Sequence, residues 1–205
     1  VSIGSSTRDK SVEVDVLGQK YLIQRFGTNG NIKKAIDMIR ELDGQVDAFG
    51  MGGIDLYLSG GAGKRYILRQ ALPIMNAASK TPIVDGTGIK NTLEGRIIKY
   101  LNDNVMELKN KKVLMTCALD RFRMAEAFYE YGSSVVIGDL IFALNIPVPI
   151  KSLKTFGRLV KLAMPVATRL PFEALYPTGE KQKENNPVRY SRFYHDADIV
   201  AGDFH

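Results

Sequence analysis

The sequence predicts an α/β protein in two parts, a mixed α/β domain followed by a partial Rossmann-like parallel sheet. Strand-like apolar runs alternate with amphipathic helical segments along the 205 residues, and this alternation favours parallel pairing. A strand, a helix and a second strand follow one another between 113 and 137, close to the length of a right-handed βαβ crossover. The polar stretch 102–110 separates the parts, so we expect domains over 1–104 and 109–205.

Turn and cap residues mark the elements of the first part. Two β-branched runs flank Gly18, which predicts a hairpin. Apolar residues then recur at helical spacing, and Asn29 or Asn31 stands where an N-cap is expected. The expected elements are strands over 1–4, 12–17 and 20–25, a helix over 32–42, a strand over 46–49, a hairpin over 55–68, a short helix over 70–78, a strand at 83–84 and a helix over 91–101.

The second part contributes three strands that we expect to pair in parallel. Its expected elements are strands over 113–117 and 134–137 around a helix over 122–131, helical pieces over 152–164 and 166–175, a polar loop over 177–187 and a last strand over 198–201. A complete Rossmann sheet has six strands, and the chain opens and closes inside or just after strand-like runs. We therefore expect it to be a piece of a longer protein that continues beyond its C-terminus.

Composition and charge exclude several classes of protein. The single cysteine, Cys117, and the two histidines exclude a disulfide framework and make a classical zinc site unlikely to form. The net charge of +6 is mild and spread along the chain, which argues against a nucleic-acid partner. No apolar run reaches the ~20 residues of a membrane-spanning helix, so we expect a cytoplasmic protein.

One region is biased toward positive charge. No acidic residue lies between Asp139 and Glu173, and Lys151, Lys154, Arg158 and Lys161 fall there on one face of a predicted helix. A basic amphipathic helix binds a membrane surface or an acidic partner in some proteins. The simpler interpretation, which we favour, is a solvated helix face.

Three glycine-containing loops are candidates for ligand binding. Asp85–Gly88 leads from a strand into a helix, the layout of an anion site, although glycines that only connect strand and helix explain it as well. Gly50–Gly53 allows close backbone approach, but a bulge or sharp turn is the better explanation. Gly60–Lys64 lacks the first glycine and the hydroxyl of a Walker loop, so we expect a hairpin turn with Lys64 at its tip.

The loop of the βαβ unit is where a dinucleotide would bind. The run 116–122 contains no glycine, and Asp120 would place negative charge near a pyrophosphate. In favour of a cofactor, Asp139 ends the second strand about 20 residues on, where an acid holds a ribose hydroxyl and selects NAD; a loop-capping aspartate is the alternative. Cys117 beside Arg121 is either a nucleophile or, more simply, a buried structural cysteine.

The run Gly88-Ile-Lys-Asn-Thr-Leu-Glu-Gly95 resembles the motif that opens the linking helix of the shikimate/quinate dehydrogenase family. Lys111-Lys-Val-Leu-Met115 and Ala197–Ala201 are similar to strands of that family's cofactor domain, and the whole layout resembles bacterial proteins labelled quinate 5-dehydrogenase. The chain departs from the pattern at Leu93, which stands where the family has its catalytic aspartate, and it lacks the motif that normally precedes the catalytic lysine.

The resemblance implies a nicotinamide-dependent oxidoreductase that acts on a polyhydroxy cyclic acid. A homo-oligomer is compatible with the sequence, which does not fix the oligomeric state. Lys64 and Glu94 would exchange the proton of the substrate hydroxyl. The expected substrate-binding residues are Asp85, Thr87, Lys90, Asn91 and Thr92, and the expected NAD-binding residues are Cys117, Asp120, Arg121 and Asp139. The alternative is a non-catalytic protein that keeps the two-domain cleft and binds a small anionic or phosphorylated ligand.

Overall fold

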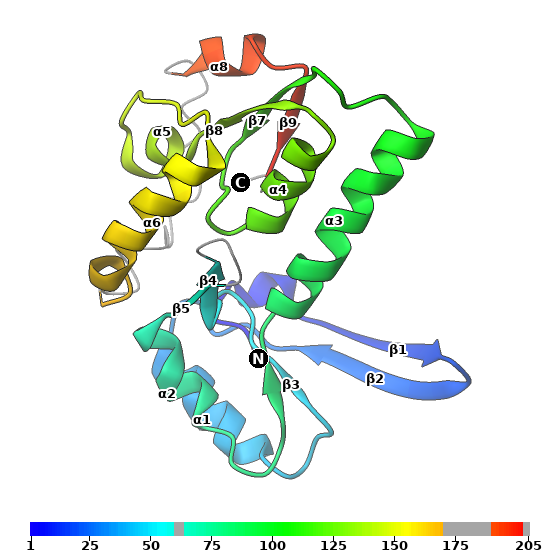
Figure 1. Cartoon of the computed structure of the whole chain (residues 1–205). Helices are drawn as coiled ribbons and strands as arrows, with labels where there is room; N and C mark the ends of the chain where they lie inside the picture. The colour runs from blue at the N-terminus through cyan, green and yellow to red at the C-terminus, as the bar shows by residue number, and fades with distance from the viewer. Residues whose placement is uncertain (60–63, 170–189, 203–205) are drawn as a thin grey trace. The chain divides into compact units, whose positions relative to one another are not determined.

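The computed structural model describes residues 1–59, 64–169 and 190–202. Figure 1 shows the helices and strands of the chain. The α/β class is confirmed, since helices and parallel strand pairs are both present. The predicted loop 177–187 and most of the helical piece 166–175 lie outside the described residues.

The chain divides into two compact units. Unit 1 comprises Val1–Leu56 and Ile67–Gly86, and unit 2 comprises Tyr57–Tyr66 and Thr87–His205. The division therefore falls at Gly86, and not within the polar stretch 102–110, where we expected it from the sequence. Its physical reason is the helix α3 (Thr87–Asn104), which packs on α4 (Phe122–Glu130) and buries Ile98 in the core of unit 2.

Short elements build unit 1. They are η1 (Ser6–Arg8), β1 (Lys10–Val16), β2 (Gln19–Arg25), α1 (Ile32–Leu42), β3 (Phe49–Gly50), η2 (Arg69–Ala71), α2 (Leu72–Met75) and β6 (Ile83–Val84). β3 and β6 pair in parallel, and Ser2 forms parallel bridges to Gly27 and Gly52. These pairings align four chain segments so that the loops that follow them lie at one carboxyl edge.

Local signals explain the first elements of unit 1. Leu17 and Gly18 both have positive φ, 56° and 80°, which is the geometry of a tight turn between antiparallel strands. The predicted hairpin is confirmed as β1 and β2. The predicted helix is confirmed as α1, and its N-cap is Asn31, whose side chain accepts a hydrogen bond from the amide of Lys34.

The end of α1 is tied to a distant loop by one carboxylate. Asp43 accepts hydrogen bonds from the backbone amides of Ser79, Lys80 and Thr81. These donors hold the pKa of Asp43 well below its usual range, because they stabilise the ionised form. The contact fixes the loop that leads into β6.

The sheet of unit 2 has three parallel strands in the order β8-β7-β9. β7 (Lys112–Met115), α4 and β8 (Ser134–Ile137) are the predicted βαβ unit, and β9 (Ile199–Ala201) pairs with the other side of β7. Figure 1 shows α4 and α6 (Leu153–Ala167) beside these strands. The further elements in this unit are the hairpin strands β4 (Tyr57–Ser59) and β5 (Arg65–Ile67, its last residue in unit 1), α5 (Asp139–Leu144) and α8 (Ser191–His195).

Three features of unit 2 differ from the prediction. α3 begins at Thr87, so the second half of the expected loop Asp85–Gly88 is helical. α6 continues through Pro165 to Ala167, because a proline late in a helix removes only one hydrogen bond near its end. α5 and α8 are too short to produce a periodic pattern. Among the described residues, no helix combines the length and apolarity needed to cross a membrane.

Candidate functional site

The carboxyl edge of β7 and β9 is the first candidate site. β8 and β9 lie on opposite sides of β7, so the order of strands reverses there, and ligands of α/β proteins bind at such a switch point. The amide of Thr116 donates to the carbonyl of Ala201 over 2.9 Å. At Gly202, with φ +135°, a Cβ atom would come within 2.1 Å of Thr116 Oγ1. Only glycine therefore fits this crossing.

Four of the predicted site residues are joined by ion pairs at this edge. Lys90 Nζ lies 2.5 Å from Asp120 Oδ1, and Arg121 Nη1 donates to Glu94 Oε1 over 2.7 Å. Arg121 Nε is also 3.4 Å from Asp120 Oδ2. Residues that we assigned to the substrate, on α3, are thus bonded to residues that we assigned to the cofactor, on the loop after β7.

Glu94 is the most deeply buried acid of this network. It is only 4% exposed, and its Oε2 atom is buried without a hydrogen-bond partner among the described residues. Burial raises the pKa of Glu94, although the hydrogen bond and charge of Arg121 act in the opposite direction. A buried carboxyl group with a raised pKa inside a cluster of charged groups is a candidate for proton exchange.

Asp139 does not stand free at the end of β8. Its two carboxylate oxygens accept hydrogen bonds from the amides of Ala118 and Leu119, each over 2.8 Å. Burial raises the pKa of Asp139 to about 6, and the two amides partly offset this effect. These contacts favour the loop-capping interpretation of Asp139 over the ribose-binding one.

The same contacts decide how well a dinucleotide fits this loop. A pyrophosphate binds backbone amides of the loop and of the helix start, but two of those amides already hold Asp139. Ala118 is fully buried, so its amide is closed to a ligand in this arrangement. The residues present therefore do not fit a pyrophosphate in this arrangement.

Other predicted site residues are not gathered at this edge. Lys64 is exposed, and its ammonium group lies 5.1 Å from the ring centroid of Tyr66. Asp85 lies in unit 1, where its carboxylate accepts a hydrogen bond from the amide of Leu56. In the described part of the chain, no hydrogen bond or ion pair joins Lys64 to Glu94.

The remaining predicted residues belong to the helix and to the loop. Thr87 and Asn91 lie in the first two turns of α3, and the Thr92 hydroxyl donates to the Gly88 carbonyl over 2.9 Å. Cys117 is a partly buried cysteine whose Sγ atom lies 3.8 Å from Thr116 Oγ1. Its partial burial suits a structural cysteine.

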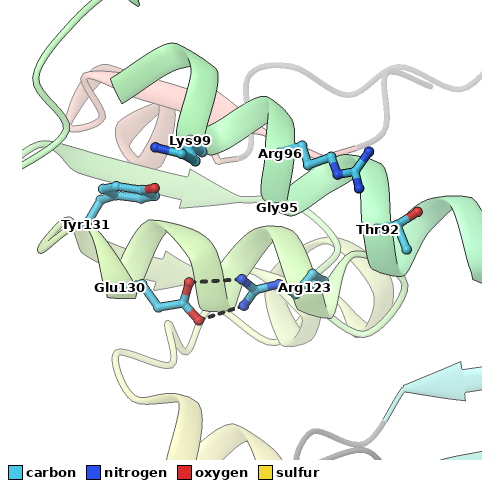
Figure 2. A pocket seen from close by; sticks show the side chains of 7 residues that line it. All are labelled: Thr92, Gly95, Arg96, Lys99, Arg123, Glu130 and Tyr131. Atoms are coloured by element: carbon cyan, nitrogen blue, oxygen red, sulfur yellow. Dashed lines mark hydrogen bonds and ion pairs between the residues drawn. The ribbon is translucent and has the colours of Figure 1, made fainter. Parts of the chain in front are cut away.

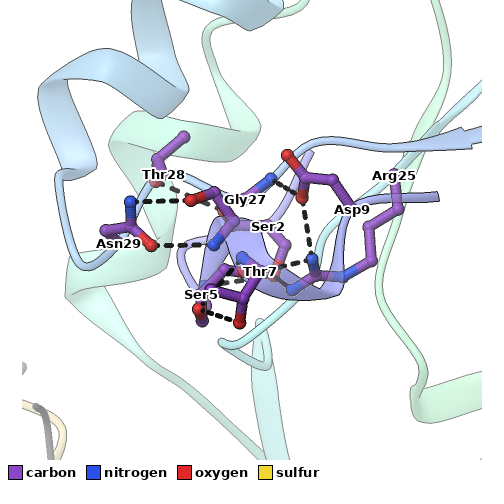
Figure 3. A network of polar contacts seen from close by, with 10 residues as sticks. Ser2, Ser5, Thr7, Asp9, Arg25, Gly27, Thr28 and Asn29 are labelled. Atoms are coloured by element: carbon purple, nitrogen blue, oxygen red, sulfur yellow. Dashed lines mark hydrogen bonds and ion pairs between the residues drawn. The ribbon is translucent and has the colours of Figure 1, made fainter.

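The carboxyl edge of unit 1 is a second candidate site, which the sequence interpretation missed. Figure 3 shows its network of polar contacts. Arg25 donates through Nη1 to the Ser5 carbonyl and to Asp9 Oδ1, and through Nη2 to Ser2 Oγ. Each of these three hydrogen bonds is 3.0 Å long. Asp9 also accepts a hydrogen bond from the amide of Gly27. Arg25 is thus a strut that fixes the loop after the first segment.

A second guanidinium group lies at the same place. The Nη2 atoms of Arg8 and Arg25 come within 3.0 and 3.1 Å of the point where Gly4 would carry a Cβ. Arg8 is exposed and, within the described residues, has no ion pair and no side-chain hydrogen bond. Two guanidinium groups thus lie side by side at this loop, and among the described residues only Arg25 has a carboxylate partner. Guanidinium groups bind carboxylate and phosphate groups through paired hydrogen bonds.

Hydroxyl groups surround the arginine pair. Ser5 Oγ and Thr7 Oγ1 are 2.7 Å apart, and Asn29 brackets Ser6 by accepting from its amide and donating to its hydroxyl. The signal in the sequence was the run Gly4-Ser-Ser-Thr-Arg8, a glycine and hydroxyl-rich loop directly after a strand-like segment. The approach of Arg25, 17 residues away from Arg8, has no such signal.

The glycine loop Gly50–Gly53 serves packing in unit 1. A Cβ at Gly52 would lie 2.8 Å from the Cβ of Ser2, and Gly53 has φ +76°. The loop therefore lets two backbones approach each other and then turns sharply. This agrees with the bulge or turn interpretation.

A shallow pocket between α3 and α4 is lined by several charged side chains (Figure 2). Arg123 donates to both carboxylate oxygens of Glu130, over 2.7 and 2.9 Å. Lys99 pairs with Asp103, and Gly95 makes room for the guanidinium group of Arg123. Most of the charge here is neutralised locally, so the arrangement holds the two helices together.

Comparison with known proteins places the chain in a family. It belongs to the family described as Domain of unknown function (DUF8754), whose model matches residues 88–205. A second model, Domain of unknown function (DUF8753), matches residues 1–85. The two matches meet where the structure divides into its two units. No curated protein and no solved structure matches the chain.

Proposed function

We propose that this protein is a small-molecule binding protein whose ligand carries a carboxylate or phosphate group. The observation that carries this proposal is Arg8, an exposed guanidinium group without a partner in the described chain, held against Gly4 beside Arg25. Within the described residues, Asp9 forms an ion pair with Arg25 but not with Arg8. The remaining positive charge lies at a carboxyl edge, where α/β proteins bind ligands, and guanidinium groups bind oxyanions through paired hydrogen bonds.

A titration with simple oxyanions tests this proposal. Inorganic phosphate and acetate are added to the protein at constant ionic strength, with chloride as the reference anion, and binding is followed by the rise in Tm. We expect Arg8→Gln to weaken phosphate binding about tenfold or more, the loss of one charged hydrogen bond. Arg40→Gln, an exposed arginine of α1 with one weak ion pair, is the matched control. Equal phosphate affinity of Arg8→Gln and the control contradicts the proposal.

A second candidate function is a shikimate/quinate dehydrogenase-like oxidoreductase that acts on a polyhydroxy cyclic acid. The observation in its favour is Glu94, a buried acid with a raised pKa and one unpartnered oxygen. In this proposal Glu94 and Lys64 exchange the proton of a substrate hydroxyl, while Lys90, Asn91 and Thr92 bind other hydroxyls. The poor fit of a pyrophosphate to the loop after β7 ranks this function second.

Binding of NADH tests the second candidate separately. NADH fluorescence is titrated with the protein, and the same titration is repeated with Glu94→Gln and with Asp139→Asn. Saturable binding that Asp139→Asn weakens supports NAD at the predicted position. If no saturable binding is found up to millimolar NADH, this candidate function is excluded. The proposal of a small-molecule binding protein does not depend on this result.

We also propose a cytoplasmic location and a homo-oligomeric state. The chain has a single cysteine and therefore no disulfide within itself, which suits a reducing compartment. Sedimentation equilibrium measures the oligomeric state, and a monomer at micromolar concentration contradicts the homo-oligomer.

A further inference from the structure

We propose that α6 docks onto a membrane surface rich in anionic lipid. The orientation of this helix within unit 2 is set by its buried stripe. Phe156, Val160 and Met164 are each at most 5% exposed and belong to the core of the unit, and the ring of Phe156 stacks on Phe122 at 6.1 Å. The opposite side of the helix therefore faces away from the core.

One flank of that outer side is uniformly basic. All of its cations are exposed, and within the described residues none of them forms an ion pair. No carboxylate lies on α6 or between 140 and 172 in the sequence. The cations on the helix are Lys154, Arg158 and Lys161, and Lys151 and Arg169 lie just beyond its two ends. Elsewhere in unit 2, at Lys90, Lys99, Arg121 and Arg123, basic groups face carboxylates.

The other flank of the outer side is apolar. Leu159, Leu162 and Val166 are 40%, 79% and 64% exposed, and they follow one another at i, i+3 and i+7. At 100° per residue these side chains lie next to the basic flank, with Leu162 between Arg158 and Val166 around the helix. Large apolar side chains beside unpaired cations are the pattern of a helix that lies in the lipid interface.

The two flanks together favour lipid over an acidic protein as the partner. Lysine and arginine side chains are long enough to reach headgroup phosphates while the neighbouring leucines enter the acyl boundary. The 15 residues of α6 extend about 22 Å, so the cations contact several headgroups at once. Each cation near an anionic surface strengthens binding about fivefold. This inference is independent of the ligand proposed for unit 1.

Vesicle co-sedimentation of the full chain tests the proposal. The protein is mixed with vesicles of 30% phosphatidylserine in phosphatidylcholine, or of phosphatidylcholine alone, at low and high salt. We expect binding to the anionic vesicles only, with a large loss at high salt because exposed charges are screened. Lys154→Gln/Arg158→Gln should weaken binding more than tenfold. Lys33→Gln/Lys34→Gln, two exposed lysines of α1, removes the same charge and should change binding less than twofold.

Leu162→Ser separates the apolar contribution from the ionic one. We expect this variant to bind anionic vesicles several-fold more weakly and to keep the salt dependence, because the cations remain. No binding of the wild type to anionic vesicles at low salt overturns the proposal. Equal losses in the α6 and α1 double variants overturn it too, since net charge would then explain binding. Binding to polyglutamate without binding to vesicles also overturns it, in favour of an acidic protein partner.

Discussion

At the carboxyl edge of unit 1 an exposed arginine, Arg8, has no partner in the described residues, whereas at the edge of unit 2 the cations face carboxylates. Both edges follow short parallel strands. In unit 2, Asp120 and Glu94 neutralise Lys90 and Arg121, and the loop amides hold Asp139. Similar topology thus produces one edge whose charged groups pair with one another and one edge that keeps an exposed arginine without a partner among the described residues.

The largest effect is expected where the unit 1 edge is most crowded. A Cβ at Gly27 would lie 2.5 Å from the carbonyl oxygen of Ser5 and 2.6 Å from its carbonyl carbon. Because these are backbone atoms, they cannot move aside as the end of a flexible side chain can. We expect Gly27→Ala to lower the free energy of unfolding by about 3 kcal/mol, measured by urea denaturation. Gly50→Ala, in the same unit with nothing within 4 Å of its Cβ position, should change it by less than about 1 kcal/mol. Equal effects would show that this edge is not tightly packed.

Removing the Asp139 carboxylate should leave groups without a partner at the unit 2 edge, as Arg8 is, within the described part of the chain, at the unit 1 edge. Asp139→Ala leaves the amides of Ala118 and Leu119 without their acceptor, which should cost about 2 kcal/mol of unfolding free energy. Because a sulfate ion can replace the lost carboxylate, we expect sulfate to restore part of this stability in the variant. Wild-type protein should gain less at the same sulfate concentration. If sulfate stabilises the variant no more than the wild type, the amides of Ala118 and Leu119 do not form an anion-binding site.

The pH dependence of stability sharpens the same comparison. Burial raises the pKa of Asp139 from 3.8 to about 6, so the folded state binds the proton more tightly than the unfolded state. The resulting stabilisation is complete below pH 4 and is lost as the pH rises through 6. Its full size, for a shift from 3.8 to about 6, is about 3 kcal/mol.

Urea denaturation at pH 4.5 and pH 7 measures this term in the wild type and in Asp139→Asn. The wild type should become more stable relative to the variant as the pH falls. Glu94, whose pKa is also raised by burial, contributes to both proteins and cancels in the difference. A difference that does not change with pH would mean that Asp139 has an ordinary pKa.

The smallest effect concerns α3, the helix that carries Lys90 and Glu94 to the unit 2 edge. Gly88 lies in its first turns with nothing within 4 Å of its Cβ position, whereas a Cβ at Gly95 would meet the Arg123 side chain at 3.0 Å. We expect Gly88→Ala to raise the free energy of unfolding by about 0.5–1 kcal/mol, because alanine favours the helix. Gly95→Ala should give no such gain, and thermal unfolding of both variants measures the contrast.

Local patterns were enough to predict much of this fold. The β7–α4–β8 unit follows from a buried apolar run, a helical period and a second apolar run, and all three depend on neighbours in the chain. The hairpin at Gly18 and the cap at Asn31 depend on backbone preferences of single residues. The unit boundary was misplaced because α3 belongs to unit 2 through packing on α4, and no local signal reports that contact.

The candidate sites divide in the same way. Residue types and their position after predicted strands selected Asp120, Arg121 and Asp139, whereas Glu94 was selected through the family resemblance, as the carboxylate next to Leu93. Partners of these residues lie 20 or more positions away in the sequence. Tertiary packing therefore decides whether each carboxylate contacts an amide or a cation. Asp139 holds a loop and Glu94 is buried beside Arg121, while Arg8 meets Arg25 over Gly4. Whether a charged group is neutralised depends on which groups the fold brings together. For this reason the tertiary structure, and not the sequence pattern, distinguishes the unit 1 edge from the unit 2 edge.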